Sequence, residues 1–212
     1  MNIPARIVTF AAILLSCGSC TWFSHQRPSL EDAHATYFGT GTGKFKGDLD
    51  VRWIKPDRFL YLPDHDHPFR FTTSDNFVIT PPGMYTDGGS IPRELWAIKD
   101  FSPWAYGPAF VTHDWLFEAH HCHTPGYENL SFERSATILA KGIKTLMETN
   151  VAPKDEVALW LIYDGVRTPV ARAIWDKNDA CNPSPQAMNI EGEHAPGELL
   201  FTMHAEGDLS QR

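Results

Sequence analysis

The spacing of apolar residues changes once along this chain, and this change limits the possible folds more than any other feature of the sequence. Before Pro81-Pro82-Gly83, apolar and polar residues alternate, which is typical of β-strands that have one face in a core. After this point apolar positions recur every three to four residues, which is typical of helices. We therefore predict an α+β fold, with a small antiparallel sheet followed by a helical half of three to four helices.

Turn-forming residues divide both halves into elements. The predicted strands cover residues 44–53, 58–62, 68–72 and 76–80. The predicted helices cover roughly residues 92–98, 106–121, 132–147 and 154–175. In the third helix, Ile138, Leu139, Ile143 and Leu146 form one apolar stripe, which indicates that this face lies in the core.

The first sixteen residues have the pattern of a secretory signal peptide. Arg6 is their only charge, and the apolar run over residues 7–15 is too short to span a bilayer of roughly 30 Å. The segment Leu14-Leu15-Ser16-Cys17 resembles the bacterial lipobox, in which the cysteine is acylated after cleavage. We therefore expect an exported lipoprotein with Cys17 as the acylated residue. A lipid on Cys20 and a plain secretion signal are the alternatives.

The remaining chain divides into three parts. Residues 17–36 are polar and are expected to form a tether, residues 37–177 a single globular domain, and residues 178–212 a loosely ordered acidic tail. Gly18 follows the lipid site where an aspartate would favour the inner membrane, so the expected location is the periplasmic face of the outer membrane. In that oxidising compartment, the simplest cysteine pairing joins Cys122 to Cys181.

The net charge of the chain limits the partners that it is expected to bind. The chain has 18 Lys and Arg residues against 26 Asp and Glu residues, which gives a net charge of −8. Binding to a phosphate backbone needs a basic face, so nucleic acid is not an expected partner. The expected partners are instead the membrane, through the lipid anchor, and a phospholipid substrate.

The residues that could carry chemistry begin in the segment TDGGSIP, residues 86–92. This glycine-rich loop runs into a helix, and the Asp87 carboxylate together with backbone carbonyls could hold a hard cation such as calcium. Further along, a predicted helix places His113 and Asp114 side by side. Both side chains need polar partners inside an apolar helix.

A cluster of possible zinc ligands follows at the end of the same predicted helix: His120, His121, Cys122 and His123. Structural zinc sites usually have four ligands in two separate pairs, and here the sequence offers one cluster. Adventitious capture of metal is therefore the favoured interpretation of these residues.

Three segments resemble a known family. The run FVITPPGMYTDGGSIPRELW…AFVTHDWLF…WLIYDGVRTPV is similar to the family called domain of unknown function 1353, which occurs in phage and bacterial genomes. The resemblance covers roughly residues 76–175, and its specific part is TDxxSxP followed by HDxLx. It implies no particular activity.

A more distant similarity is to secreted phospholipases A2. Those enzymes carry a Thr-Asp loop, then a helix with His-Asp, then a second helix, and this chain has Thr86-Asp87-Gly88 and His113-Asp114 in the same order. By that resemblance Asp87, Asp114 and the Gly88 carbonyl would bind calcium, and His113 would be the general base. The helical half would resemble the phospholipase A2 helix pair.

The second helix departs from the phospholipase pattern. The aspartate that orients the histidine in those enzymes falls at about Ser135, and a hydroxyl cannot stabilise an imidazolium as a carboxylate does. Glu133 or Asp164 are possible substitutes. Two functional hypotheses follow: a calcium-dependent ester hydrolase of the envelope, or a non-catalytic envelope lipoprotein in which these polar residues form a structural network.

Overall fold

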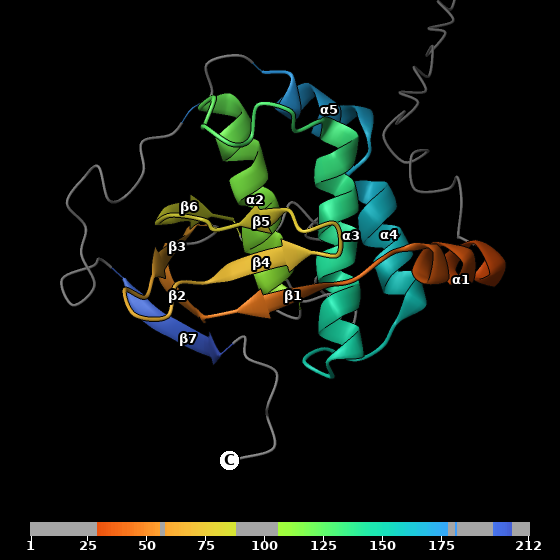
Figure 1. The fold of residues 1–212 in the computed structure, drawn as a ribbon, viewed down its shortest axis with the longest axis horizontal. Helices are drawn as coiled ribbons and strands as arrows, with labels where there is room; N and C mark the ends of the chain where they lie inside the picture. Colours follow the sequence, from red (N-terminus) through yellow and green to blue (C-terminus); the bar gives the residue numbers. More distant parts are fainter. Residues whose placement is uncertain (1–28, 56–57, 88–105, 178–180, 182–196, 205–212) are drawn as a thin grey trace, which may run out of the picture.

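The computed structural model describes residues 29–55, 58–87, 106–177, 181 and 197–204. Within these residues strands come first and helices follow, with one helix before the strands and one strand after the helices (Figure 1). The predicted α+β class is therefore confirmed. The helices are α1 (Leu30–Gly39), α2 (Gly107–His121), α3 (Phe132–Glu148), α4 (Glu156–Gly165) and α5 (Pro169–Trp175).

The strands form two antiparallel sheets. The three-stranded sheet has the order β1-β4-β5, and the four-stranded sheet has the order β6-β3-β2-β7. Their bounds are β1 (Gly43–Lys46), β2 (Asp48–Lys55), β3 (Arg58–Pro63), β4 (Arg70–Thr73), β5 (Val78–Ile79), β6 (Met84–Thr86) and β7 (Glu198–His204).

A glycine separates the two sheets. The predicted strand over residues 44–53 is divided at Gly47, whose φ of 81° lies in the left-handed region that favours glycine. A Cβ at this position would lie 2.2 Å from the carbonyl oxygen of Pro68. Gly47 thus lets the chain pass from β1 in one sheet to β2 in the other.

Helices α2 and α3 pack against each other at the centre of the helical half (Figure 1). Helix α3 begins after Ser131, whose hydroxyl accepts a hydrogen bond from the amide of Arg134 at 3.1 Å. The two helices approach closely at Gly142, where a Cβ would lie 3.0 Å from the Cβ of Ala109. The apolar stripe predicted for this helix is buried in this interface and in the core beside it.

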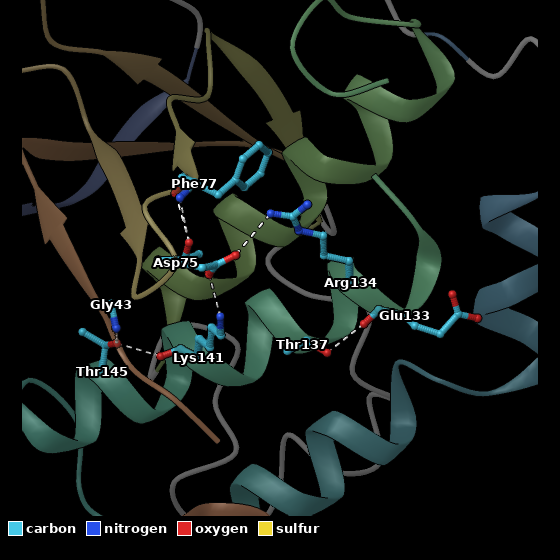
Figure 2. Close-up of polar contacts among 9 residues, drawn as sticks. Gly43, Asp75, Phe77, Glu133, Arg134, Thr137, Lys141 and Thr145 are labelled. Carbon is cyan, nitrogen blue, oxygen red and sulfur yellow. Dashed lines mark hydrogen bonds and ion pairs between the residues drawn. The ribbon is translucent and has the colours of Figure 1, made fainter. Parts of the chain in front are cut away.

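Polar contacts fasten the three-stranded sheet to α3 (Figure 2). In the turn between β4 and β5, Asp75 accepts hydrogen bonds from Lys141 at 2.7 Å and Arg134 at 3.2 Å. The bond from Lys141 is the main reason that the pKa of Asp75 lies well below its usual range. Nearby, the amide of Gly43 donates to Thr145 Oγ1 at 2.8 Å.

The long helix predicted over residues 154–175 is two helices. Helix α4 ends at Gly165, and α5 begins at Pro169 after Thr168, whose hydroxyl accepts a hydrogen bond from the Ala171 amide at 3.4 Å. A proline is favoured in the first turn of a helix but interrupts its interior, so Pro169 starts a new helix here. The helix predicted over residues 92–98 lies outside the described residues.

The predicted tether over residues 17–36 is too long. Its last part forms α1, which packs against α4 and buries Ala33 and Tyr37. Tyr37 also donates a hydrogen bond to Glu148 at 2.7 Å. These two buried residues lie four apart on one helical face, and Ser29 caps the helix by accepting from the Asp32 amide at 3.0 Å.

The predicted loose tail over residues 178–212 also needs a correction. Residues 198–204 form β7, which pairs with β2 as an edge strand of the four-stranded sheet. The backbone hydrogen bonds of this pairing order a segment whose sequence has little periodicity. Cys181, in the same predicted tail, is covalently bound to Cys122.

One core joins the sheets and helices. Its largest fully buried side chains are Tyr37, Tyr61, Tyr106, Phe69, Phe71, Phe110, Leu49, Leu60, Ile79, Leu116, Ile138 and Leu139. They come from both halves of the chain, so the strands and helices form one folded unit. In the part of the chain that the structure describes, no helix combines the length and apolar composition needed to cross a bilayer.

Candidate functional site

Strand β6 brings the predicted loop residues next to α2. Thr86 is the last residue of β6, is buried, and donates a hydrogen bond from Oγ1 to Asp114 Oδ2 at 2.5 Å. Asp87 follows directly and is exposed. The carboxyl groups of Asp87 and Asp114 interact electrostatically, although 27 positions separate them in the sequence. The fold therefore brings together two of the three predicted metal ligands.

The surroundings of Asp114 destabilise the charged form of its carboxyl group. Burial raises its pKa well above the usual value, and the negative charge of Asp87 raises the pKa further. The hydrogen bond from Thr86 acts in the opposite direction, because it stabilises the carboxylate. A positive charge placed between the two carboxyl groups would offset the repulsion between them and stabilise the Asp114 carboxylate.

His113, the residue before Asp114 in α2, is a buried, neutral imidazole. Burial lowers its pKa to about 4, so the ring carries no charge at pH 7. Its Nε2 is buried and has no hydrogen-bond partner among the described residues. The ring contacts Phe117, with 5.0 Å between centroids. A buried nitrogen of this kind is a place where a water molecule or a ligand can bind.

Ser135 lies in α3 and is fully buried. Its hydroxyl donates to the Phe132 carbonyl of the same helix at 2.8 Å. Within the described residues no hydrogen bond joins Ser135 to His113, so its role as the partner of His113 stays a prediction.

The two carboxylates suggested as substitutes for that partner have other surroundings. Glu133 forms an ion pair with Arg172 at 2.8 Å, and Asp164 is exposed near the end of α4. Gly88 and Cys17 lie outside the described residues, and their predicted roles as a calcium ligand and as the acylated residue stay predictions.

The predicted pairing of Cys122 with Cys181 is present as a disulfide, with 4.8 Å between the Cα atoms. It ties the segment after α5 to the end of α2. The neighbouring histidines of the zinc cluster also have other contacts. His120 stacks on Trp175 with 4.0 Å between ring centroids, and His121 Nε2 lies 3.0 Å from the Ile174 carbonyl oxygen.

Sequence reasoning did not assign a role to Thr86. Its position in TDGGSIP is visible in the sequence, but β6 is only three residues long and was not among the predicted strands. A strand this short has too few alternating positions to be recognised from its pattern. The burial of Thr86, and hence its bond to Asp114, depends on the pairing of β6 with β3.

Comparison with known proteins supports one family. Residues 65–166 match the family model described as "Protein of unknown function (DUF1353)". This segment, about half of the chain, contains Asp87, His113, Asp114 and Ser135. No curated protein and no solved structure matches the chain, and the similarity to phospholipases A2 gains no support from these comparisons. Residues 65–166 are therefore a DUF1353 domain, a domain of unknown function.

Proposed function

We propose that this protein is an exported lipoprotein of the cell envelope whose DUF1353 domain binds calcium through Asp87 and Asp114. The observation that carries the proposal is the interaction between these two carboxyl groups at the end of β6 and in α2. Carboxylate oxygens suit calcium better than zinc, which prefers nitrogen and sulfur ligands. The backbone carbonyl of Gly88, next to Asp87, is the third proposed ligand.

The electrostatics of Asp114 support a cation at this place. Its raised pKa means that binding of a divalent ion competes with binding of a proton. Calcium binding should therefore release protons and should weaken as the pH falls. Thr86 holds the Asp114 carboxyl through its hydrogen bond and would orient it toward the ion.

The proposed location follows from the N-terminal sequence. The lipobox-like segment ending in Cys17 supports acylation, and Gly18 supports sorting to the periplasmic face of the outer membrane. The lipid anchor would make the membrane a permanent partner. The net charge of −8 supports a role without nucleic acid.

Calcium titration of the full chain, purified in detergent, tests the site by isothermal calorimetry. We expect Asp87→Asn and Asp114→Asn each to weaken calcium binding at least about tenfold. Asp66→Asn is the matched control, because its side chain is 83% exposed and contacts His65 at 3.0 Å. Equal calcium affinity in all four proteins would contradict the proposal. Mass spectrometry of the wild type and of Cys17→Ala tests the acylation separately.

A second candidate function, hydrolysis of a phospholipid ester, is favoured by the buried Nε2 of His113. The neutral imidazole can accept a proton from an attacking water molecule. Bound calcium would polarise the ester carbonyl and stabilise the developing oxyanion. The low pKa of about 4 makes His113 a weak base, so we expect slow turnover.

Fatty-acid release from mixed phospholipid vesicles distinguishes the two functions. Hydrolysis predicts release that requires calcium, stops with EGTA, and is lost in His113→Asn. Calcium binding without release, from a protein shown to be folded by circular dichroism, would reject hydrolysis and would leave the binding function standing.

A further inference from the structure

Three potential metal ligands, none of them a proposed calcium ligand, meet at the C-terminal end of α2. They are the carboxylate of Glu118 and the sulfur atoms of Cys122 and Cys181, and these ligand atoms all lie within 4.8 Å of one another. Glu118 is in the last turn of α2 and Cys122, one turn further on, directly follows the helix, whereas Cys181 comes from the segment after α5. We propose that reduction of the Cys122–Cys181 disulfide converts this cluster into a zinc site.

The chemistry of the conversion is thiol–disulfide exchange followed by metal binding. A dithiol reductant transfers two electrons and two protons to the disulfide and itself becomes a disulfide, which leaves two thiols on the chain. One Zn²⁺ ion then replaces the two thiol protons, which pass to the solvent. Cys181 is exposed and Cys122 is partly exposed, so a reductant can reach the bond.

The spacing of the three atoms fits a tetrahedral zinc ion. Zinc–sulfur bonds of about 2.3 Å and zinc–oxygen bonds of about 2.1 Å place such ligands roughly 3.5–3.8 Å apart. All three atoms are already within 4.8 Å, so small side-chain movements are sufficient. The two thiolates alone balance the charge of the ion, the Glu118 carboxylate adds one negative charge to the centre, and the fourth position is left for a water molecule.

Contacts other than the disulfide hold the end of α5, six residues before Cys181, on α2. Trp175, at the end of α5 and six residues before Cys181, packs edge-on against Phe117 at 4.9 Å and stacks on His120 at 4.0 Å. His121 Nε2 lies within hydrogen-bond distance of the Ile174 and Trp175 carbonyl oxygens, at 3.0 and 3.2 Å. These contacts keep the start of the Cys181 segment on α2.

The segment after α5 would therefore stay attached to α2 in both redox states. Under oxidising conditions the disulfide ties the segment after α5 to α2, and under reducing conditions zinc would do the same. The segment matters to the fold because the chain beyond it returns as β7 to pair with β2. This site does not depend on the calcium site or on acylation.

Zinc titration of the full chain with and without a dithiol reductant tests the proposal. Cys17 and Cys20 are replaced by serine in every protein, so that Cys122 and Cys181 are the only thiols. We expect the reduced chain to bind one zinc ion more than the oxidised chain. Cobalt added in place of zinc should give thiolate charge-transfer absorption in the reduced chain only.

Variants separate this site from chance binding by the nearby histidines. Cys181→Ser should abolish binding of the additional zinc ion. Glu118→Gln should lower the zinc affinity at least roughly tenfold, because removal of a group that only contacts a metal ligand already has an effect of this size. His123→Ala, the matched control, should bind as before. Equal zinc binding by the folded oxidised and reduced chains would overturn the proposal. So would a reduced Glu118→Gln chain that binds like the parent.

Discussion

The buried imidazole of His113 should make the protein sensitive to mild acid. The pKa of a free histidine is 6.5, whereas burial lowers the pKa of His113 to about 4. Above pH 6.5 the ring is neutral in both the folded and the unfolded chain, so it adds no pH dependence. Between pH 6.5 and 4 the unfolded chain takes up a proton that the folded chain does not bind. The contribution of His113 to the free energy of unfolding therefore decreases as the pH falls through this range.

The size of this decrease follows from the two pKa values. At pH 5 the unfolded chain is favoured by about 2 kcal/mol through this one group, because each pH unit below 6.5 contributes about 1.4 kcal/mol. Asp114 acts with the opposite sign, since its raised pKa lets the folded chain bind a proton first. A comparison with His113→Asn cancels the Asp114 effect, because that carboxyl is present in both proteins.

The assay is urea unfolding of the wild type and His113→Asn at pH 7.5 and pH 5. We compare the unfolding free energy of the variant with that of the wild type at each pH. This difference, variant minus wild type, should be about 2 kcal/mol more positive at pH 5 than at pH 7.5. His65→Asn is the control: this exposed histidine has a pKa raised by its bond to Asp66, so its effect should have the opposite sign. A difference that is the same at both pH values would refute the assignment of His113 as buried and neutral.

Three further variants test what stabilises the fold, by urea unfolding. Removal of the disulfide by Cys122→Ser with Cys181→Ser should cost about 4 kcal/mol in zinc-free buffer, because the bond spans a sequence separation of 59 residues. Tyr37→Phe should cost about 1 kcal/mol, since it removes the hydrogen bond to Glu148, and a cost of zero would mean that this bond adds nothing to the docking of α1. Gly142→Ala should cost about 1 kcal/mol net, because crowding against α2 at 3.0 Å exceeds the gain in helix propensity, and a stabilised variant would show that the helices can separate.

The fold class could be predicted because the apolar period changes at Pro81-Pro82-Gly83, and a change of period is a local property of the sequence. Helices α2 and α3 begin and end within a residue of their predicted bounds for the same reason. The division of the first predicted strand at Gly47 could not be predicted. It depends on the approach of Pro68, which is a contact between distant segments.

The structure at the two ends of the domain could not be predicted, for a related reason. Helix α1 buries only Ala33 and Tyr37, and two apolar positions are too few to stand out against a polar background. Strand β7 is ordered by its pairing with β2, and backbone hydrogen bonds leave little trace in a sequence. In both cases the tertiary partner supplies the order that local propensity lacks.

The candidate site was only partly accessible from the sequence. The carboxylates of Asp87 and Asp114 were identified from the order of motifs, and the fold does place them in electrostatic contact. The neutral state of His113 follows from burial, which a pattern of residues does not measure. The hydrogen bond from Ser135 to the Phe132 carbonyl of its own helix could not be predicted either, because a serine hydroxyl in a helix has several possible partners.

The segments outside the family match are attached to the family domain at three separate places. Helix α1 packs on α4, Cys181 is bound to Cys122 directly after α2, and β3, which lies before residue 65, pairs with β6. These attachments use three different kinds of interaction: side-chain packing, a covalent bond and backbone hydrogen bonds. Since β2 also pairs with β3 and β3 with β6, the strand that ends at Thr86 is held by a sheet built mostly from residues outside the match. The geometry of Thr86, Asp87 and Asp114 therefore depends on these added strands, and residues 65–166 alone would lack the support that places the two carboxylates together.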